Sequence, residues 1–269
     1  MAAVIMDGKA LAKKIKDQLK VEIAGFTTQP RLTIVANEEN DASAVYVRNK
    51  QKDCEEVGIA CRVCYPDVED IYDCVFGMKY SDMVNGVICQ MPVKNGVDEK
   101  ELLSCIDKEK DVDGFVSDKF DPCTPAGIME LLKEYNINIT GKHCVVVGRS
   151  DIVGKPMAKM LLDADGTVTV CHSKTKNLAE ITRQADILVA AVGRSKMITA
   201  DMVKDGAVVI DVGINRDENG KLCGDVDFAS VAKKASHITP VPGGVGPMTR
   251  AMLLVNTVKA YKNQNTKGV

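Results

Sequence analysis

The sequence contains no tryptophan and three histidines, and aromatic side chains make up 4% of its 269 residues. No stretch reaches the roughly 18 uninterrupted apolar residues of a membrane-spanning helix. The N-terminus interleaves apolar residues with lysines, unlike a signal peptide. Thirty-five basic and thirty-seven acidic residues leave a formal charge of -2, so no global field attracts nucleic acid or an anionic membrane. We expect a cytoplasmic protein that binds neither.

Ten cysteines are present but no export signal accompanies them, which favours reduced thiols over disulfides. The one C-x-x-C pair, Cys61 and Cys64, lacks the second ligand pair of a zinc site, and the histidines do not supply it at metal-like spacing. We therefore predict no metal, and interpret the cysteines as core residues. Whether Cys61 and Cys64 respond to oxidants is left open.

Apolar, β-rich runs alternate with helical patterns along the whole chain, which predicts an α/β fold with parallel sheets. We expect two lobes with a cleft between them. The first is an α/β catalytic domain over residues 1–120, completed by a C-terminal helix over 247–264. The second is a Rossmann-type, doubly wound parallel-sheet domain over 121–246. Helices are expected at 8–24, 43–58, 67–80 and from 124, with Thr124 as the N-cap; strands are expected at 31–37, 59–64, 86–92, 143–148, 167–173, 186–193 and 207–215.

The stretch "VVVGRSDIVGKPMAKML" reads as a strand, a tight turn and a helix, with glycines at 148 and 154. A dinucleotide-binding turn needs a glycine where the chain reverses and a helix N-terminus directed at the pyrophosphate. In this chain Ser150 replaces the middle glycine of G-x-G-x-x-G, and one residue is added before Gly154. The turn alone therefore leaves open a strand-to-helix connection without a ligand.

The end of the next strand bears on the choice of cofactor. NAD-preferring sites usually present an acidic residue about 20 positions after the glycine turn. Here "CHSKTK" places Ser173 25 residues after Gly148, with Lys174 beside it and no carboxylate nearby. With Arg149 in the turn, such a pocket suits a 2′-phosphate, and we favour NADP over NAD. Lys176 is expected only to be solvated.

Residues 43–59, "SAVYVRNKQKDCEEVGI", have the pattern of an amphipathic helix. Tyr46 and Lys50 are four residues apart, so their side chains share one face. By local evidence alone, a lysine on so charged a helix points into solvent. In "DVDG", Asp111 is expected to be a turn residue, and the same interpretation is open for Asp113.

Several stretches together resemble one family, the bifunctional methylenetetrahydrofolate dehydrogenase/methenyltetrahydrofolate cyclohydrolases. The matching pieces, in the family's order, are "YVRNK", "EEVGI", "QMPV", "DKEKDVDGF", "PCTPAGI", "GRSDIVGKP", "TVTVCHSKT", "VVIDVGIN", "GDVDF" and "ITPVPGGVGPMT". The resemblance implies a folate-binding catalytic lobe, an NADP-binding lobe and a homodimer formed largely through the latter. It also implies two reactions: oxidation of 5,10-methylenetetrahydrofolate to the methenyl form, then hydrolysis to 10-formyltetrahydrofolate.

The resemblance also assigns roles to residues. Lys50 would exchange protons during water attack, Gln90 would position it, Asp113 would hold the pterin edge and Tyr46 would flank the ring system. The implied substrate-binding residues are Tyr46, Val47, Lys50, Gln90, Met91, Pro92, Asp113, Pro242, Gly243 and Gly244. The implied cofactor-binding residues are Gly148, Arg149, Ser150, Ile152, Val153, Pro156, His172, Ser173 and Ile214. For "PGGVGP", a turn that leads into a helix is the alternative.

Two segments depart from the family pattern. "ANEENDAS" lacks a usual glycine and proline, and "MPVKN" replaces a leucine-proline-leucine-proline run, so substrate affinity and the relative rates of the two reactions are left open. The nearest alternatives are a dehydrogenase with little or no cyclohydrolase activity, or NAD specificity. More distant ones are a nicotinamide-dependent oxidoreductase of the amino-acid or shikimate type, and an NADP-sensing module without turnover.

Overall fold

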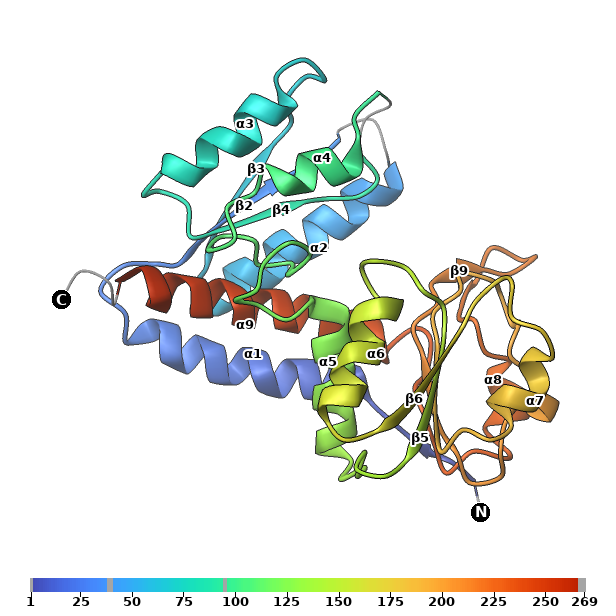
Figure 1. The fold of residues 1–269 in the computed structure, drawn as a ribbon. Helices are drawn as coiled ribbons and strands as arrows, with labels where there is room; N and C mark the ends of the chain where they lie inside the picture. Colours follow the sequence, from blue (N-terminus) through green and yellow to red (C-terminus); the bar gives the residue numbers. More distant parts are fainter. Residues whose placement is uncertain (1, 38–40, 94–95, 266–269) are drawn as a thin grey trace. The chain divides into compact units, whose positions relative to one another are not determined.

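The computed structural model describes residues 2–37, 41–93 and 96–265. The chain divides into two compact units (Figure 1). Unit 1 consists of Met1–Ala12 and Thr124–Thr249, and unit 2 of Lys13–Cys123 and Arg250–Val269. The α/β fold class is confirmed. The lobe limits of 1–120 and 121–246 stay predictions, and the first twelve residues, which they place in the N-terminal lobe, cluster with unit 1.

Unit 1 contains a six-stranded sheet in which every neighbouring pair is parallel. Its order is β1 (Val4–Ile5), β11 (His237–Ile238), β8 (Val208–Asp211), β7 (Ile187–Ala190), β5 (His143–Val147) and β6 (Thr167–Cys171). The central strands β7 and β8 are buried at all their residues, as expected for a sheet covered on both faces. The predicted strands are therefore present, whereas β1 and β11 were not predicted.

Helices cover both faces of this sheet, as in a doubly wound fold (Figure 1). The helices α5 (Cys123–Glu134) and α6 (Gly154–Asp163) lie on one face. The short helices α7 (Leu178–Thr182) and α8 (Phe228–Val231) lie on the other, where their apolar residues join a core of buried valines, leucines and alanines. A 3-10 turn η2 (Ala200–Met202) and an antiparallel hairpin of β9 (Asn215–Arg216) and β10 (Leu222–Cys223) complete the unit.

Unit 2 is built on a three-stranded parallel sheet of order β3 (Ala60–Cys64), β2 (Arg31–Val35) and β4 (Gly86–Cys89). Its helices are α2 (Asp41–Val57), α3 (Ile71–Gly77), η1 (Met78–Tyr80) and α4 (Glu99–Ser104), together with most of α1 (Gly8–Ala24) and α9 (Val245–Asn265). The aromatic rings of Phe26 and Tyr261 stack with centroids 4.9 Å apart and connect the chain after α1 to α9.

Two predictions of local structure were wrong. The helix expected over 67–80 begins only at Ile71, because the backbone turns at Asp67–Asp70, and its last three residues form the 3-10 turn η1. Thr124 is not the N-cap of its helix, because α5 already begins at Cys123. The Thr124 hydroxyl instead lies 2.9 Å from the hydroxyl of Thr249 on α9. The helix expected over 8–24 is confirmed.

The ten cysteines all lie in the described ranges and all are free. Five of them are buried, as expected of core residues: Cys54, Cys89, Cys123, Cys144 and Cys171. The other five are only partly buried, so the interpretation as core residues was wrong for them: Cys61, Cys64, Cys74, Cys105 and Cys223. No helix among the described residues combines the length and the apolar character needed to cross a bilayer. Within the same residues, no group of three or more histidine, cysteine or acidic side chains has the arrangement of a metal site.

Candidate active site

The turn between β5 and α6 has the two glycines that close backbone packing requires. Gly148 has a φ of +130°, and a Cβ at this position would lie 2.1 Å from the carbonyl oxygen of Ala191. Gly154 is the first residue of α6, and a Cβ there would lie 2.3 Å from the carbonyl oxygen of Gly148. The strand, the turn and the helix N-terminus therefore approach as closely as in a dinucleotide-binding turn, without the middle glycine of the usual motif.

Ser150, which replaces that middle glycine, contacts the N-terminus of α6. Its Oγ accepts hydrogen bonds from the backbone N–H groups of Val153 (3.2 Å) and Gly154 (3.3 Å). The first N–H groups of a helix have no partner within the helix and attract anions. The hydroxyl therefore satisfies groups that, in a dinucleotide site, face a phosphate.

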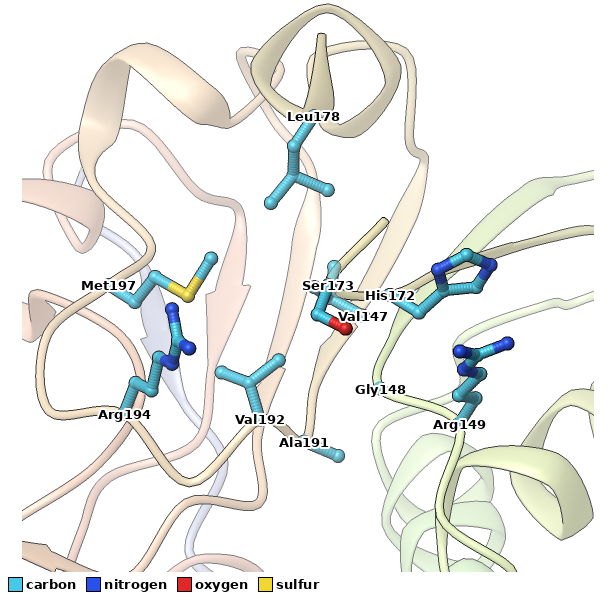
Figure 2. Close-up of a pocket in the computed structure, with 10 residues that line it drawn as sticks. All are labelled: Val147, Gly148, Arg149, His172, Ser173, Leu178, Ala191, Val192, Arg194 and Met197. Carbon is cyan, nitrogen blue, oxygen red and sulfur yellow. The ribbon is translucent and has the colours of Figure 1, made fainter. Parts of the chain in front are cut away.

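A pocket of about 250 Å³ opens beside this turn (Figure 2). It lies at the carboxyl ends of β5, β6 and β7, where ligands of open parallel sheets bind. Its polar lining comes from Arg149, His172, Ser173 and Arg194, and none of its lining residues is acidic. The full lining is Val147, Gly148, Arg149, His172, Ser173, Leu178, Ala191, Val192, Arg194 and Met197. Such a lining favours an anionic ligand with an apolar part.

The nine predicted cofactor residues fall into two groups. Gly148, Arg149, His172 and Ser173 line the pocket. The other five do not line it: Ser150, Ile152 and Val153 belong to the turn, Pro156 lies in the first turn of α6, and Ile214 follows β8 with 51% of its surface exposed. The wall formed by Ala191, Val192, Arg194 and Met197 was missed. The strand before this wall was predicted. Because the carboxyl ends of parallel strands lie at the same edge of a sheet, that strand could have been used to place the residues after it beside the glycine turn.

Helix α2 presents the predicted folate residues in unit 2. Tyr46 is 42% exposed and Lys50 is half-buried, so neither side chain is part of the core. Val47 is 2% exposed and belongs to the core, so its predicted contact with folate finds no support in its burial and stays a prediction. The helix ends at Val57, and the next residue, Gly58, has a φ of +92°, which suits a glycine, and donates its N–H to the carbonyl of Cys54.

The Lys50 side chain is directed at the end of β4. Its Nζ donates a hydrogen bond of 3.0 Å to Oε1 of Gln90. Gln90 is held in turn, because its Nε2 donates to the carbonyl of Met91 (3.0 Å), and the peptide bond from Met91 to Pro92 is cis. The structure therefore brings together Lys50 and Gln90, which the sequence separates by 40 residues.

Asp113 lies close enough to Lys50 for the two side chains to interact electrostatically. Burial raises the pKa of the Asp113 carboxyl, while the positive charge of Lys50 and a hydrogen bond from the Cys123 thiol act in the opposite direction. Burial, followed by the Asp113 charge, raises the pKa of the Cys123 thiol well above its usual value. A carboxylate partly removed from water is suited to accept paired N–H donors from a ligand.

Asp111 organises the turn that carries Asp113, as the sequence analysis expected. Its Oδ2 accepts hydrogen bonds from the N–H groups of Val116 (2.7 Å) and Ser117 (2.8 Å). Gly114 closes the turn with a φ of +75°, and a Cβ there would lie 2.7 Å from the backbone of Asp121. Asp111 is fully buried, and burial raises the pKa of its carboxyl.

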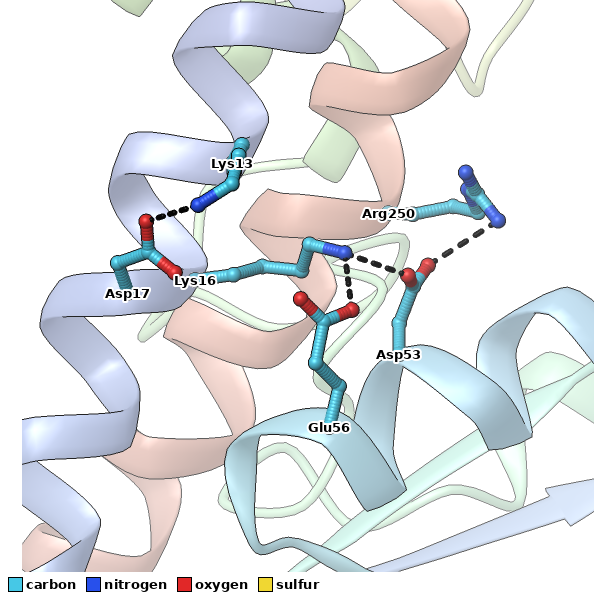
Figure 3. Close-up of polar contacts among 6 residues, drawn as sticks. All are labelled: Lys13, Lys16, Asp17, Asp53, Glu56 and Arg250. Carbon is cyan, nitrogen blue, oxygen red and sulfur yellow. Dashed lines mark hydrogen bonds and ion pairs between the residues drawn. The ribbon is translucent and has the colours of Figure 1, made fainter.

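An ion-pair network holds α2 against α1 and α9 within unit 2 (Figure 3). The buried Asp53, three residues after Lys50, pairs with Lys16 (3.0 Å) and Arg250 (3.1 Å). Lys16 also pairs with Glu56 at 2.5 Å. Burial lowers the pKa of Lys16, but the hydrogen bonds to Glu56 and Asp53 outweigh it and the net shift is upward. The network fixes the helix that presents Lys50.

The predicted loop residues Pro242, Gly243 and Gly244 belong to unit 1. The peptide bond before Pro242 is cis, and the Gly243 carbonyl accepts a hydrogen bond of 2.9 Å from the N–H of Lys9. Gly244 packs tightly, since a Cβ there would lie 2.6 Å from the carbonyl oxygen of Pro240. Their contact with folate stays a prediction, as does the cleft expected between the lobes. The segments "ANEENDAS" and "MPVKN" lie partly outside the described residues.

Comparisons with known proteins cover nearly the whole chain. Residues 6–113 match the catalytic domain of the tetrahydrofolate dehydrogenase/cyclohydrolase family, and residues 122–265 match its NAD(P)-binding domain. The chain is 50% identical to the Bifunctional protein FolD of Campylobacter hominis, over 97% of this chain and 98% of that protein. The matches run through both units.

Solved structures agree with this. The structure of the bifunctional enzyme FolD from Campylobacter jejuni has a TM-score of 0.94 and 45% identity, covering 98% of this chain and 100% of its own. A methylenetetrahydrofolate dehydrogenase-cyclohydrolase from Trypanosoma brucei, complexed with NADP cofactor and inhibitor, has a TM-score of 0.93 and 35% identity, covering 98% and 99%.

Proposed function

The chain belongs to the tetrahydrofolate dehydrogenase/cyclohydrolase family, and from this membership we propose how its residues divide the two reactions. It is a bifunctional enzyme of folate one-carbon metabolism. It oxidises 5,10-methylenetetrahydrofolate to 5,10-methenyltetrahydrofolate with NADP, and hydrolyses the product to 10-formyltetrahydrofolate. The residue roles below are our assignments.

The cofactor pocket of unit 1 fits NADP. When bound, NADP supplies the acceptor for the hydride that leaves the methylene carbon. At Gly148 and Gly154 a Cβ would collide with the backbone of Ala191 and of Gly148, so strand, turn and helix pack closely, as they do in a pyrophosphate-binding turn. Arg149 and Ser173 line the pocket, and its lining contains no carboxylate. A 2′-phosphate needs hydrogen-bond donors and a positive charge, and these two side chains supply them.

Lys50 is our assignment for proton exchange in the cyclohydrolase reaction. Water adds to the methenyl carbon and loses a proton, and the ring then opens to the 10-formyl product. The unprotonated Lys50 amine beside that carbon accepts the proton and returns it to the nitrogen that leaves, and the carbinol hydroxyl loses its own proton to water as the formyl C=O forms. Gln90 supports this role, because its Oε1 accepts from the Lys50 Nζ at 3.0 Å and fixes the direction of the amine. This pair is the observation that carries the proposal.

Asp113 and Tyr46 are assigned to folate binding. The partly buried Asp113 carboxylate is suited to accept two N–H groups from the amino-pyrimidine edge of the pterin. Tyr46 stands one turn before Lys50 on α2 with 42% of its surface exposed, so its ring is free to contact a ligand. A dehydrogenase without useful cyclohydrolase activity is disfavoured, because it has no need for the Lys50–Gln90 pair.

We also propose that the protein is a homodimer formed through unit 1. The strand β6 is at the edge of the six-stranded sheet, and an unprotected edge pairs readily with another strand. Val170 on β6 is 39% exposed and Leu162 on α6 is 61% exposed, which gives this edge an apolar surface. The size of the protein in sedimentation tests this assignment: a species of one chain's mass, 29.1 kDa, would contradict it.

The proposed function is tested by following both reactions on the purified protein. Methylenetetrahydrofolate with NADP should produce NADPH and then 10-formyltetrahydrofolate, and isolated methenyltetrahydrofolate should be hydrolysed faster than in buffer. NAD in place of NADP should give a lower kcat/KM. A protein that binds NADP but turns over neither substrate would contradict the proposal.

A further inference from the structure

The loop that follows β7 is anchored by a carboxylate from a distant segment. Oδ2 of Asp225 accepts hydrogen bonds from the backbone N–H groups of Val192 (2.6 Å) and Gly193 (3.0 Å). Oδ1 accepts from the N–H of Arg194 (2.8 Å) and from Nδ2 of Asn215 (2.9 Å). Three consecutive N–H groups that converge on one anion form a backbone nest. The shape of the loop therefore depends on Asp225.

Asp225 is itself fixed. It has no exposed surface, and its two oxygens each accept two hydrogen bonds, which uses the usual capacity of a carboxylate. Its backbone N–H donates to Oδ1 of the buried Asp211 at the end of β8 (2.8 Å). The residue before it is Gly224, where a Cβ would lie 1.8 Å from Oδ2 of Asp211. The carboxylate therefore has one position available.

The loop that Asp225 holds forms one wall of the cofactor pocket. Val192 and Arg194 line that pocket, and Figure 2 shows the Arg194 and Arg149 guanidinium groups on opposite sides of it. The structure gives Arg194 no ion-pair partner among the described residues, and the pocket lining contains no carboxylate. A second cation is therefore presented to whatever fills the pocket.

We propose that Asp225 is a positioning residue for cofactor binding. It holds residues 192–194 of the pocket wall, and so places the Arg194 guanidinium where it stabilises the phosphate charge of NADP(H). This inference rests on the proposed function for the identity of the ligand. Asp225 belongs to the stretch "GDVDF", but no local pattern connects it with Arg194, which is 31 residues away.

The test uses the full-length protein and NADPH. In Asp225→Asn the side-chain volume is kept, but an amide nitrogen replaces an oxygen that accepts two N–H groups. The dissociation constant for NADPH, measured by calorimetry, should rise tenfold or more. The KM for NADP should rise by a larger factor than kcat falls, and the KM for the folate should stay unchanged. The matched control is Asp227→Asn, two residues away, whose side chain makes no cap hydrogen bond.

A second variant keeps the proposal testable if Asp225→Asn folds poorly. Arg194 is exposed, so Arg194→Ala should melt like the wild type while binding NADPH at least fivefold more weakly. Wild-type NADPH affinity in Arg194→Ala would overturn the proposal. So would an Asp225→Asn protein with a lower melting temperature but unchanged NADPH affinity. Calorimetry needs no turnover, so a wild type that binds NADPH but is inactive on folates contradicts the proposed function and not this inference.

Discussion

The Nζ of Lys50 lies 3.0 Å from Oε1 of Gln90, and this contact joins the middle of α2 to the carboxyl end of β4. An amide oxygen is an acceptor at every pH at which the protein folds, so it holds the lysine in one direction whether or not a ligand is bound. The amide is held in turn by the Met91 carbonyl. A proton-exchanging group has to be held in a fixed direction toward the atoms between which it moves the proton.

Gln90→Ala should therefore impair hydrolysis more than hydride transfer. Without its acceptor the Lys50 side chain gains rotamer freedom, and we expect kcat for methenyltetrahydrofolate hydrolysis to fall by about 10- to 100-fold. The dehydrogenase rate should fall less, because that step needs no protein acid or base. Gln51→Ala, on the same helix and next to Lys50, is the matched control. Equal losses in both reactions would contradict the assignment of Gln90.

Asp53→Asn should destabilise the protein. The substitution leaves Lys16 and Arg250 facing a neutral amide in a site where the Asp53 side chain is 10% exposed. Breaking a buried ion pair from one side costs about 3 kcal/mol, to be read from urea unfolding. Figure 3 also shows the control, the pair of Lys13 and Asp17, in which both side chains are more than half exposed. Asp17→Asn should cost less than about 1 kcal/mol. Similar losses from both substitutions would be evidence against a structural role for the network.

Arg149→Ala should change cofactor preference. Loss of a guanidinium from a phosphate removes a charge-assisted contact of about 1.5 to 3 kcal/mol, which corresponds to a roughly 10- to 100-fold rise in the KM for NADP. The KM for NAD should change little. Lys176→Ala, at a position expected only to be solvated, provides the comparison. A shift of less than a few-fold in the ratio of kcat/KM for NADP and NAD would refute the 2′-phosphate assignment.

As the pH rises from about 4 to about 6, the titration of Asp211 should lower the free energy of unfolding. Burial raises the pKa of its carboxyl to about 6, against hydrogen bonds from Asp225, Val226 and Gly213 that act to lower it. Because the folded state then binds the proton more tightly than the unfolded state, stability from this group is greatest below the unfolded value of 3.8 and is lost as the pH rises through 6.

The matching measurement compares unfolding free energies at pH 5 and pH 7. From pH 7 to pH 5, the free energy of unfolding of the wild type should rise by about 1 kcal/mol more than that of Asp211→Asn. Asn cannot accept the N–H of Val226 through its amide nitrogen, so this variant is also expected to be less stable at both values. The same pH dependence in both proteins would show that Asp211 titrates in its ordinary range.

Much of the architecture could be predicted from the sequence because its signals are local. The helix Gly8–Ala24, the strands β5, β6, β7 and β8 and the glycine turn at Gly148 each follow from periodicity or from a backbone requirement. The strand Val4–Ile5 could not be predicted, because two exposed residues carry no pattern and the strand exists only through its pairing with His237–Ile238.

Part of the site could also be predicted from the sequence. Lys50, Gln90 and Asp113 were selected by family resemblance, and the structure groups them. The pocket wall at Arg194 carries no local motif. Its place depends on the alignment of β7 with β5 and on hydrogen bonds to Asp225, and both are tertiary relationships.

The most direct test of the central claim is the hydrolysis of methenyltetrahydrofolate by Lys50→Met, with Lys52→Met as the control on the exposed side of the same helix. Methionine keeps much of the length and apolar stem of lysine but cannot exchange protons. We predict a fall in kcat of at least about 100-fold, with folate binding still measurable and Lys52→Met unaffected. Hydrolysis by Lys50→Met at the wild-type rate would contradict the account.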